Sequence, residues 1–158
     1  MRARRLDLVC KEMVMGVEEG AFNFGAPFFA WRHIVAIESY RDLRVWQTGM
    51  DLVTDIYRIT ESFPTHEKFG LIAQLRRAGI SIVSNIAEGH GRSTRGEYMQ
   101  QLSVARGSTI EVEVDLLVAE RLGYTETETL AVARERCESI CRMLTRLKRS
   151  LASKGRGS

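Results

Sequence analysis

The sequence predicts an all-α protein, an antiparallel up-down-up-down four-helix bundle with a short N-terminal extension. The 158 residues contain two prolines, which leaves long stretches free of helix breakers. Apolar residues make up 44% and charged residues 27%, a balance that suits one globular domain rather than a largely disordered chain or a membrane protein. After residue 40, apolar residues recur at alternating steps of three and four over long segments.

Residues 1–39 are expected to form the N-terminal extension. Apolar residues at helical spacing between Leu6 and Val17 permit one short helix, and several glycines and Pro27 then interrupt the pattern. Three interpretations of this extension stay open. It covers an apolar groove, it self-associates through its phenylalanines, or it is a loosely ordered leader that reflects an upstream start codon.

The compartment is expected to be the cytoplasm. Three cysteines are an odd number and give no disulfide framework. The basic start of the chain is like the first part of a signal peptide, but Asp7, Lys11 and Glu12 interrupt the apolar stretch that should follow. The most apolar run, residues 26–37, is about half the ~20 residues that a membrane-spanning helix needs. We therefore expect no membrane partner.

Four apolar stripes mark the bundle helices. The first stripe is Val45, Gly49, Leu52, Ile56, Ile59 and Phe63; the second is Ile72, Leu75, Gly79, Ile82 and Ile86; the third is Tyr98, Leu102, Ala105, Thr109, Val112, Leu116 and Ala119; the fourth is Leu130, Ala133, Cys137, Ile140, Leu144, Leu147 and Leu151. Their spacing averages about 3.5 residues, as in helices that pack side by side at about +20°. The predicted bundle covers residues 40–152, and residues 153–158 form a basic tail.

Breakers and caps separate the stripes. The expected helix ends are Pro64, Gly89 with Gly91, and Gly123, and the expected caps are Thr65, the pair Thr94 and Glu97, and the pair Thr125 and Glu128. The connections are only a few residues long, so consecutive helices should be antiparallel neighbours.

Several short motifs fall in a familiar order. They are Tyr40–Gln47, Phe63–Pro64, Gly70–Leu71, Gln74–Ala78, Ser84–Gly89, Gly91–Arg92, Ala105, Gly107–Ser108, Glu111 and Leu122–Tyr124. Over about residues 40–150 the chain resembles the small four-helix-bundle proteins encoded in intervening sequences of bacterial large-subunit ribosomal RNA genes. The resemblance implies a homopentameric ring. It also implies similarity to the accessory protein of diversity-generating retroelements, which binds nucleic acid and a reverse transcriptase.

One position departs from the family's pattern. Family members usually carry a proline after Ser-Ile in the second helix, where this chain has Val83. The kink that such a proline imposes is therefore optional here, and the path of the second helix is an open point.

No catalytic, cofactor-binding or metal-binding residue is predicted. The Glu-x-x-His pairs of di-iron bundles are absent, and the three histidines fall in the extension and in loops. Cys137 lies on the apolar seam with Cys141 one turn away, and further soft ligands are missing nearby. The glycine-rich segment 89–93 is either an anion site at a helix start or a plain helix end. Asn85 and Glu88 are expected to fix the end of the second helix rather than to catalyse a reaction.

Charge separates along the predicted bundle. The topology gathers basic residues at the end where the first helix begins, the second meets the third and the fourth finishes. The predicted nucleic-acid contacts there are Arg92, Arg95, Arg146, Lys148 and Arg149. The alternative is a solvated surface, because basic residues in the last turn also complement the helix dipole. Base-specific readout is not expected, since no recognition-helix or RNA-binding aromatic motif is present.

A second set of residues predicts self-association. Arg76 and Arg77 lie beside the second stripe and call for carboxylate partners such as Glu111, within or between subunits. Trp46 and Tyr57 widen the first stripe beyond what one core needs. We therefore expect a non-enzymatic homo-oligomer that binds structured RNA such as rRNA. The alternative is a protein-interaction scaffold, for example for a reverse transcriptase, without direct nucleic-acid contact.

Overall fold

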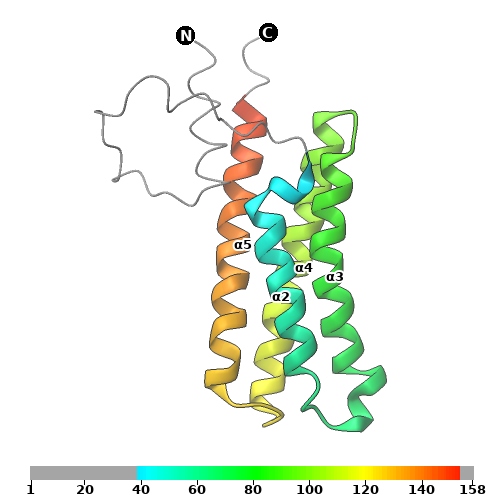
Figure 1. Ribbon diagram of the computed structural model, residues 1–158, viewed down its shortest axis with the longest axis vertical. Helices are drawn as coiled ribbons and strands as arrows, with labels where there is room; N and C mark the ends of the chain where they lie inside the picture. Colours follow the sequence, from blue (N-terminus) through cyan, green and yellow to red (C-terminus); the bar gives the residue numbers. More distant parts are fainter. Residues whose placement is uncertain (1–38, 154–158) are drawn as a thin grey trace, which may run out of the picture.

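The computed structural model describes residues 39–153, and within that range every regular element is helical (Figure 1). The long helices are α2 (Arg44–Ile59), α3 (Leu71–His90), α4 (Arg95–Arg121) and α5 (Thr127–Ser153), with short 3₁₀ helices η2 (Tyr40–Asp42) and η3 (Thr65–Phe69). The all-α, four-helix prediction is confirmed. The interpretations offered for residues 1–38 and for the basic tail lie outside the described residues.

Side-chain contacts give the direction of each helix. Hydrogen bonds between α3 and α4 join Gln74 with Asp115, Ser81 with Ser108, and Glu88 with Gln101. Numbers rise along α3 as they fall along α4, so these two helices run in opposite directions. The contacts of Glu120 with Arg134 and of Ser103 with Lys148 relate α4 and α5 in the same way. Arg136 of α5 pairs with Asp55 of α2, which closes the bundle.

The predicted stripes form the core. Side chains with almost no exposure include Leu52 and Ile56 of α2, Leu75, Ile82 and Ile86 of α3, Leu102 and Leu116 of α4, and Leu130, Ile140 and Leu144 of α5. Every stripe position is buried except Ile72, Tyr98 and Leu151, which lie near helix ends and are partly covered. A periodic apolar stripe therefore identified the buried face of each helix.

The connection between α2 and α3 differs from the prediction. α2 ends at Ile59, before Phe63 and Pro64, and Thr65 begins η3 instead of capping α3. α3 begins at Leu71, whose backbone N–H donates to Oε2 of Glu67 at 2.8 Å. The carboxylate of Glu67, one turn upstream of Leu71, thus takes the capping role. The prediction that Thr65 caps this helix was wrong.

The remaining helix ends mix agreement and correction. Thr94 caps α4 by accepting a hydrogen bond from the backbone N–H of Glu97, as predicted, whereas α5 begins at Thr127, later than the predicted Thr125 cap. Gly123 follows α4 with a φ of 69°, a left-handed conformation that glycine adopts without strain. Gly89 lies inside α3 rather than ending it. A Cβ there would be 2.7 Å from the ring of Tyr98, so glycine permits close packing of α3 on α4.

α3 runs without interruption through Val83. Val83 is buried against α2, where its Cγ1 would lie 2.8 Å from a Cβ at Gly49. Gly79 of α3 approaches Ile56 of α2 in the reciprocal way, also at 2.8 Å. Two glycines therefore let α2 and α3 pack closely, and the position of the family's usual proline serves here as a packing residue.

Candidate nucleic-acid interface

The basic end of the bundle is the end where α2 begins, α3 turns into α4 and α5 finishes (Figure 1). Its basic residues come from separate parts of the chain. They are Arg41, Arg44, Arg92, Arg95, Arg146, Lys148 and Arg149. All except the half-buried Lys148 are exposed. The acidic residues of this end are Asp42, Glu88 and Glu97. The fold thus brings the five predicted nucleic-acid contacts to one end of the molecule.

The predicted contacts differ in what holds them. Arg95, Arg146 and Arg149 form no side-chain hydrogen bond or ion pair in the described part of the chain. Lys148 donates from Nζ to Oγ of Ser103 at 2.6 Å, which ties α5 to α4. Arg92 pairs with Glu88 at 3.6 Å. Three arginines are therefore available to a ligand without breaking an existing contact, whereas Lys148 and Arg92 are already engaged.

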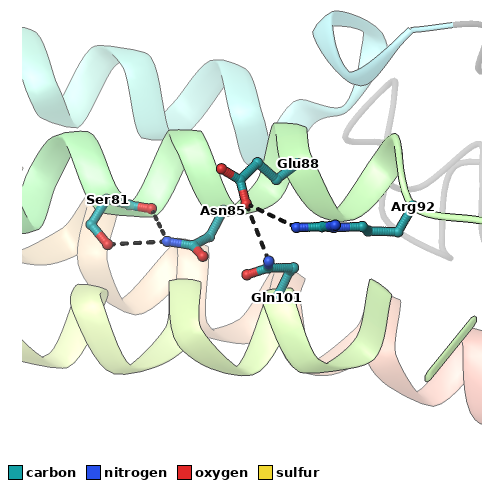
Figure 2. A network of polar contacts seen from close by, with 5 residues as sticks. All are labelled: Ser81, Asn85, Glu88, Arg92 and Gln101. Carbon is teal, nitrogen blue, oxygen red and sulfur yellow. Dashed lines mark hydrogen bonds and ion pairs between the residues drawn. The ribbon is translucent and has the colours of Figure 1, made fainter. Parts of the chain in front are cut away.

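A polar network links α3 to α4 beside this end (Figure 2). Oε2 of Glu88 accepts a hydrogen bond from Nε2 of Gln101 at 3.2 Å and faces the guanidinium of Arg92. One turn earlier, Nδ2 of Asn85 donates to the carbonyl of Ser81 at 2.7 Å. Glu88 therefore connects the end of α3 to its neighbour, as the sequence predicted, while Asn85 bonds within α3.

The first turn of α4 contains a carboxylate, that of Glu97. Thr94 donates its hydroxyl to Oε2 of Glu97 at 2.6 Å, and this hydrogen bond lowers the pKa of Glu97 below the ordinary 4.5. A carboxylate in the first turn complements the positive end of the helix dipole. The segment 89–93 is therefore better described as a helix end followed by a cap than as a phosphate cradle. Burial beneath this turn raises the pKa of Tyr98 to about 12, so its hydroxyl stays protonated.

The residues predicted for self-association fall into two groups. Arg76 donates from Nε to Oγ1 of Thr60 at 2.9 Å, and its guanidinium lies 4.4 Å from the ring centre of Tyr57. Trp46 packs on the core with its ring 5.2 Å from that of Tyr40. These contacts are all within one chain. Arg77 and Glu111 are instead exposed on α3 and α4 and keep their charged groups open to a partner.

Two features of α4 were not predicted, namely the burial of Asp115, which was expected to form a salt bridge with Arg76 or Arg77, and an apolar outer face. Asp115 is 5% exposed, with Oδ1 accepting from Gln74 at 3.3 Å and Oδ2 lacking a hydrogen-bond partner. Burial, with a further contribution from Glu111, raises the pKa of this carboxyl above 3.8. The outer face of α4 also carries exposed apolar side chains, namely Val104, Ile110, Val114 and Val118. The spacing of these exposed apolar residues was visible in the sequence, but the burial of Asp115 depends on the packing of α3 on α4.

Two other kinds of site are absent from the described residues. No group of three or more His, Cys, Asp or Glu side chains in residues 39–153 is placed to hold a metal ion. Within the same residues, no helix is both long enough and apolar enough to cross a membrane.

Comparison with known proteins decides the family. The model of the 23S rRNA-intervening sequence protein family matches residues 41–146, about two thirds of the chain. This chain belongs to that family. Among solved structures, a protein of unknown function from the S23 ribosomal protein family of Bacteroides thetaiotaomicron is similar, with a TM-score of 0.62 and 22% identity over 66% of this chain and 95% of that one. At that identity the likeness supports the fold alone. None of the curated proteins compared matches the chain.

The match to the 23S rRNA-intervening sequence proteins includes most of the basic end. Arg92 and Arg95 lie inside the matched residues, Arg146 is the last of them, and Lys148 and Arg149 follow immediately. The family name identifies the chain's relatives by the genes that encode them. The chemistry of the basic end has to be argued from its own side chains.

Proposed function

We propose that this protein is a non-enzymatic RNA-binding bundle whose basic end contacts the phosphate backbone of structured RNA, with rRNA as the leading partner. The observation that carries the proposal is that Arg95, Arg146 and Arg149 are exposed and that none of them pairs with a carboxylate of residues 39–153. Guanidinium groups bind phosphate through paired N–H donors, and each contact releases counterions from the nucleic acid.

The opposite end supports this assignment by contrast. Acidic residues gather there in the connection between α2 and α3 and around the start of α5, namely Glu61, Glu67, Glu126 and Glu128. A net charge of +3 is modest for the chain as a whole, but its separation orients a polyanion toward one end. The exposed groups of the basic end are arginines rather than stacking aromatics, so the contact is expected to read the backbone and not the base sequence.

Fluorescence anisotropy with a labelled rRNA hairpin tests the proposal. The variant Arg95→Glu/Arg149→Glu reverses two charges at the basic end. Its matched control, Arg58→Glu/Arg121→Glu, makes the same charge change at exposed positions near the opposite end. We expect at least tenfold weaker binding for the first variant and a much smaller change for the control. Equal losses would show that only net charge matters, and unchanged binding by both would refute the basic end as the interface.

We also propose that the bundle self-associates through the outer face of α4. Val104, Val114 and Val118 are 41%, 51% and 39% exposed on a helix whose inner face is already buried. A helix that is apolar on both faces is typical of one covered on both sides. The pentamer implied by the family resemblance would place several basic ends in one assembly and strengthen binding by multivalency.

Light scattering after size-exclusion chromatography measures the assembly. Val114→Glu/Val118→Glu should lower its mass, whereas Val132→Glu, an exposed valine on α5, should not. An assembly that forms normally without RNA affinity would favour the alternative function, a scaffold for a protein such as a reverse transcriptase. The exposed apolar face of α4 is the observation that supports this second candidate.

A further inference from the structure

Arg92 differs from the other arginines of the basic end because a carboxylate stands beside it. Nη2 of Arg92 lies 3.6 Å from Oε2 of Glu88, and the two side chains are 47% and 59% exposed. Exposed ion pairs of this length hold weakly, because water screens the attraction and both side chains lose freedom. The ion pair with Glu88 therefore holds the guanidinium of Arg92 only weakly.

Glu88 has a second partner that does not depend on Arg92. The same Oε2 accepts a hydrogen bond from Nε2 of Gln101 on α4 at 3.2 Å (Figure 2). If the guanidinium turns away, the carboxylate remains bonded to the neighbouring helix. Releasing Arg92 thus costs one weak ion pair and leaves Glu88 with a partner.

We propose that Glu88 is a positioning residue that competes with RNA phosphate for Arg92 and so limits the affinity of the basic end. The proposal rests on the proposed function. A phosphate can accept two parallel N–H donors from the guanidinium fork, whereas Glu88 meets it at one distant nitrogen. Phosphate therefore replaces Glu88 when the neighbouring arginines hold the RNA in place. The ligand class that follows is a polyanion with closely spaced phosphates rather than an isolated phosphate ion.

The test compares Glu88→Gln with a matched control, Glu138→Gln. Glu138 also pairs with an arginine one turn later, Arg142, at 3.3 Å, and both of those side chains are similarly exposed. Both variants remove one negative charge, so the net charge changes equally. Glu138 lies two helical turns before Arg146, about 12 Å along the axis, which is beyond the ~10 Å screening length at 0.1 M salt.

The measurements are the Kd for the rRNA hairpin and its dependence on salt. We expect Glu88→Gln to bind about two- to fivefold more tightly at about 0.1 M salt. We also expect its slope of log affinity against log salt to stay close to that of the wild-type protein, because Arg92 contacts the phosphate in both complexes. Glu138→Gln should change neither quantity. In an Arg92→Gln background, Glu88→Gln should lose its effect, since Glu88 acts through Arg92.

The outcomes separate this proposal from the proposed function. If the protein binds RNA but Glu88→Gln behaves like Glu138→Gln or binds more weakly, the competition is refuted and RNA binding stands. An equal gain in affinity from Glu88→Gln in the Arg92→Gln background would refute the role of Arg92 and leave a general charge effect. If the wild-type protein does not bind the hairpin even at low salt, both proposals fail. Circular dichroism of each variant verifies that the helices are intact.

Discussion

The close packing of α2 on α3 predicts that two glycine-to-alanine changes will have different effects on stability. A Cβ at Gly49 would lie 2.8 Å from Cγ1 of Val83, well inside the ~3.5–4.0 Å of normal carbon contacts. A Cβ at Gly107 of α4 meets no atom within 4 Å. Both positions are inside helices, where alanine is favoured over glycine by about 1 kcal/mol.

The magnitude follows from the difference between the two sites. Val83 is β-branched and strongly prefers one χ1 rotamer in a helix, so it cannot easily turn its methyl group away. Overpacking of this kind costs about 1–3 kcal/mol. Gly107→Ala should therefore raise the free energy of unfolding by about 1 kcal/mol. Gly49→Ala should come out about 1–3 kcal/mol less stable than Gly107→Ala.

Removing the obstructing methyl groups should restore the stabilising effect of alanine at Gly49. In a Val83→Ala background the space is open, and Gly49→Ala should then stabilise the protein by about 1 kcal/mol. The coupling energy should exceed the ~0.3–0.5 kcal/mol expected for independent sites. Urea unfolding followed by circular dichroism measures all four variants, at low protein concentration so that self-association does not contribute. Equal stabilisation by Gly49→Ala and Gly107→Ala, or no gain of stability from Gly49→Ala in the Val83→Ala background, would refute the packing argument.

Three further predictions follow from buried groups. The pKa of Asp115 is raised in the folded state, so the free energy of unfolding should fall as pH rises from about 3.8 through the folded pKa and then level off. Asp115→Asn should flatten this part of the pH profile, and an unchanged slope would contradict the role of burial. Burial raises the pKa of Cys137 to about 12, so in a Cys10→Ser background a thiol reagent at neutral pH should modify the half-buried Cys141 first and Cys137 only on unfolding. Leu116→Ala should cost about 2–5 kcal/mol in urea unfolding because Leu116 is fully buried, whereas Val114→Ala, at an exposed position, should stay within about 0.5 kcal/mol for the isolated chain.

The sequence alone determined the helices and their buried faces. The apolar stripes matched the core because the helical period is a local property, and each side chain's face follows from its number in the chain. The ends of the helices were harder to place. Glu67 replaced Thr65 as the group that receives the first N–H of α3, since a 3₁₀ turn between the helices moved the start of α3 to Leu71.

The candidate site was predictable in its location but not in its contacts. Alternating helix directions place the start of α2, the turn after α3 and the end of α5 together, so the basic end could be predicted by counting helices. Which of its side chains are open could not. Lys148 is held by Ser103, and Arg92 by Glu88, because the register between neighbouring helices sets those distances.

The tertiary structure alone decided three further features. The burial of Asp115, the contact of Gly89 with Tyr98 and the stacking of Arg76 on Tyr57 each depend on the rotation and axial shift of one helix against another. A periodic pattern shows which face of a helix is buried, but it contains no information on the axial position of that helix relative to its neighbour. The sequence therefore determined which faces meet, and only the packed bundle determined which atoms meet across them.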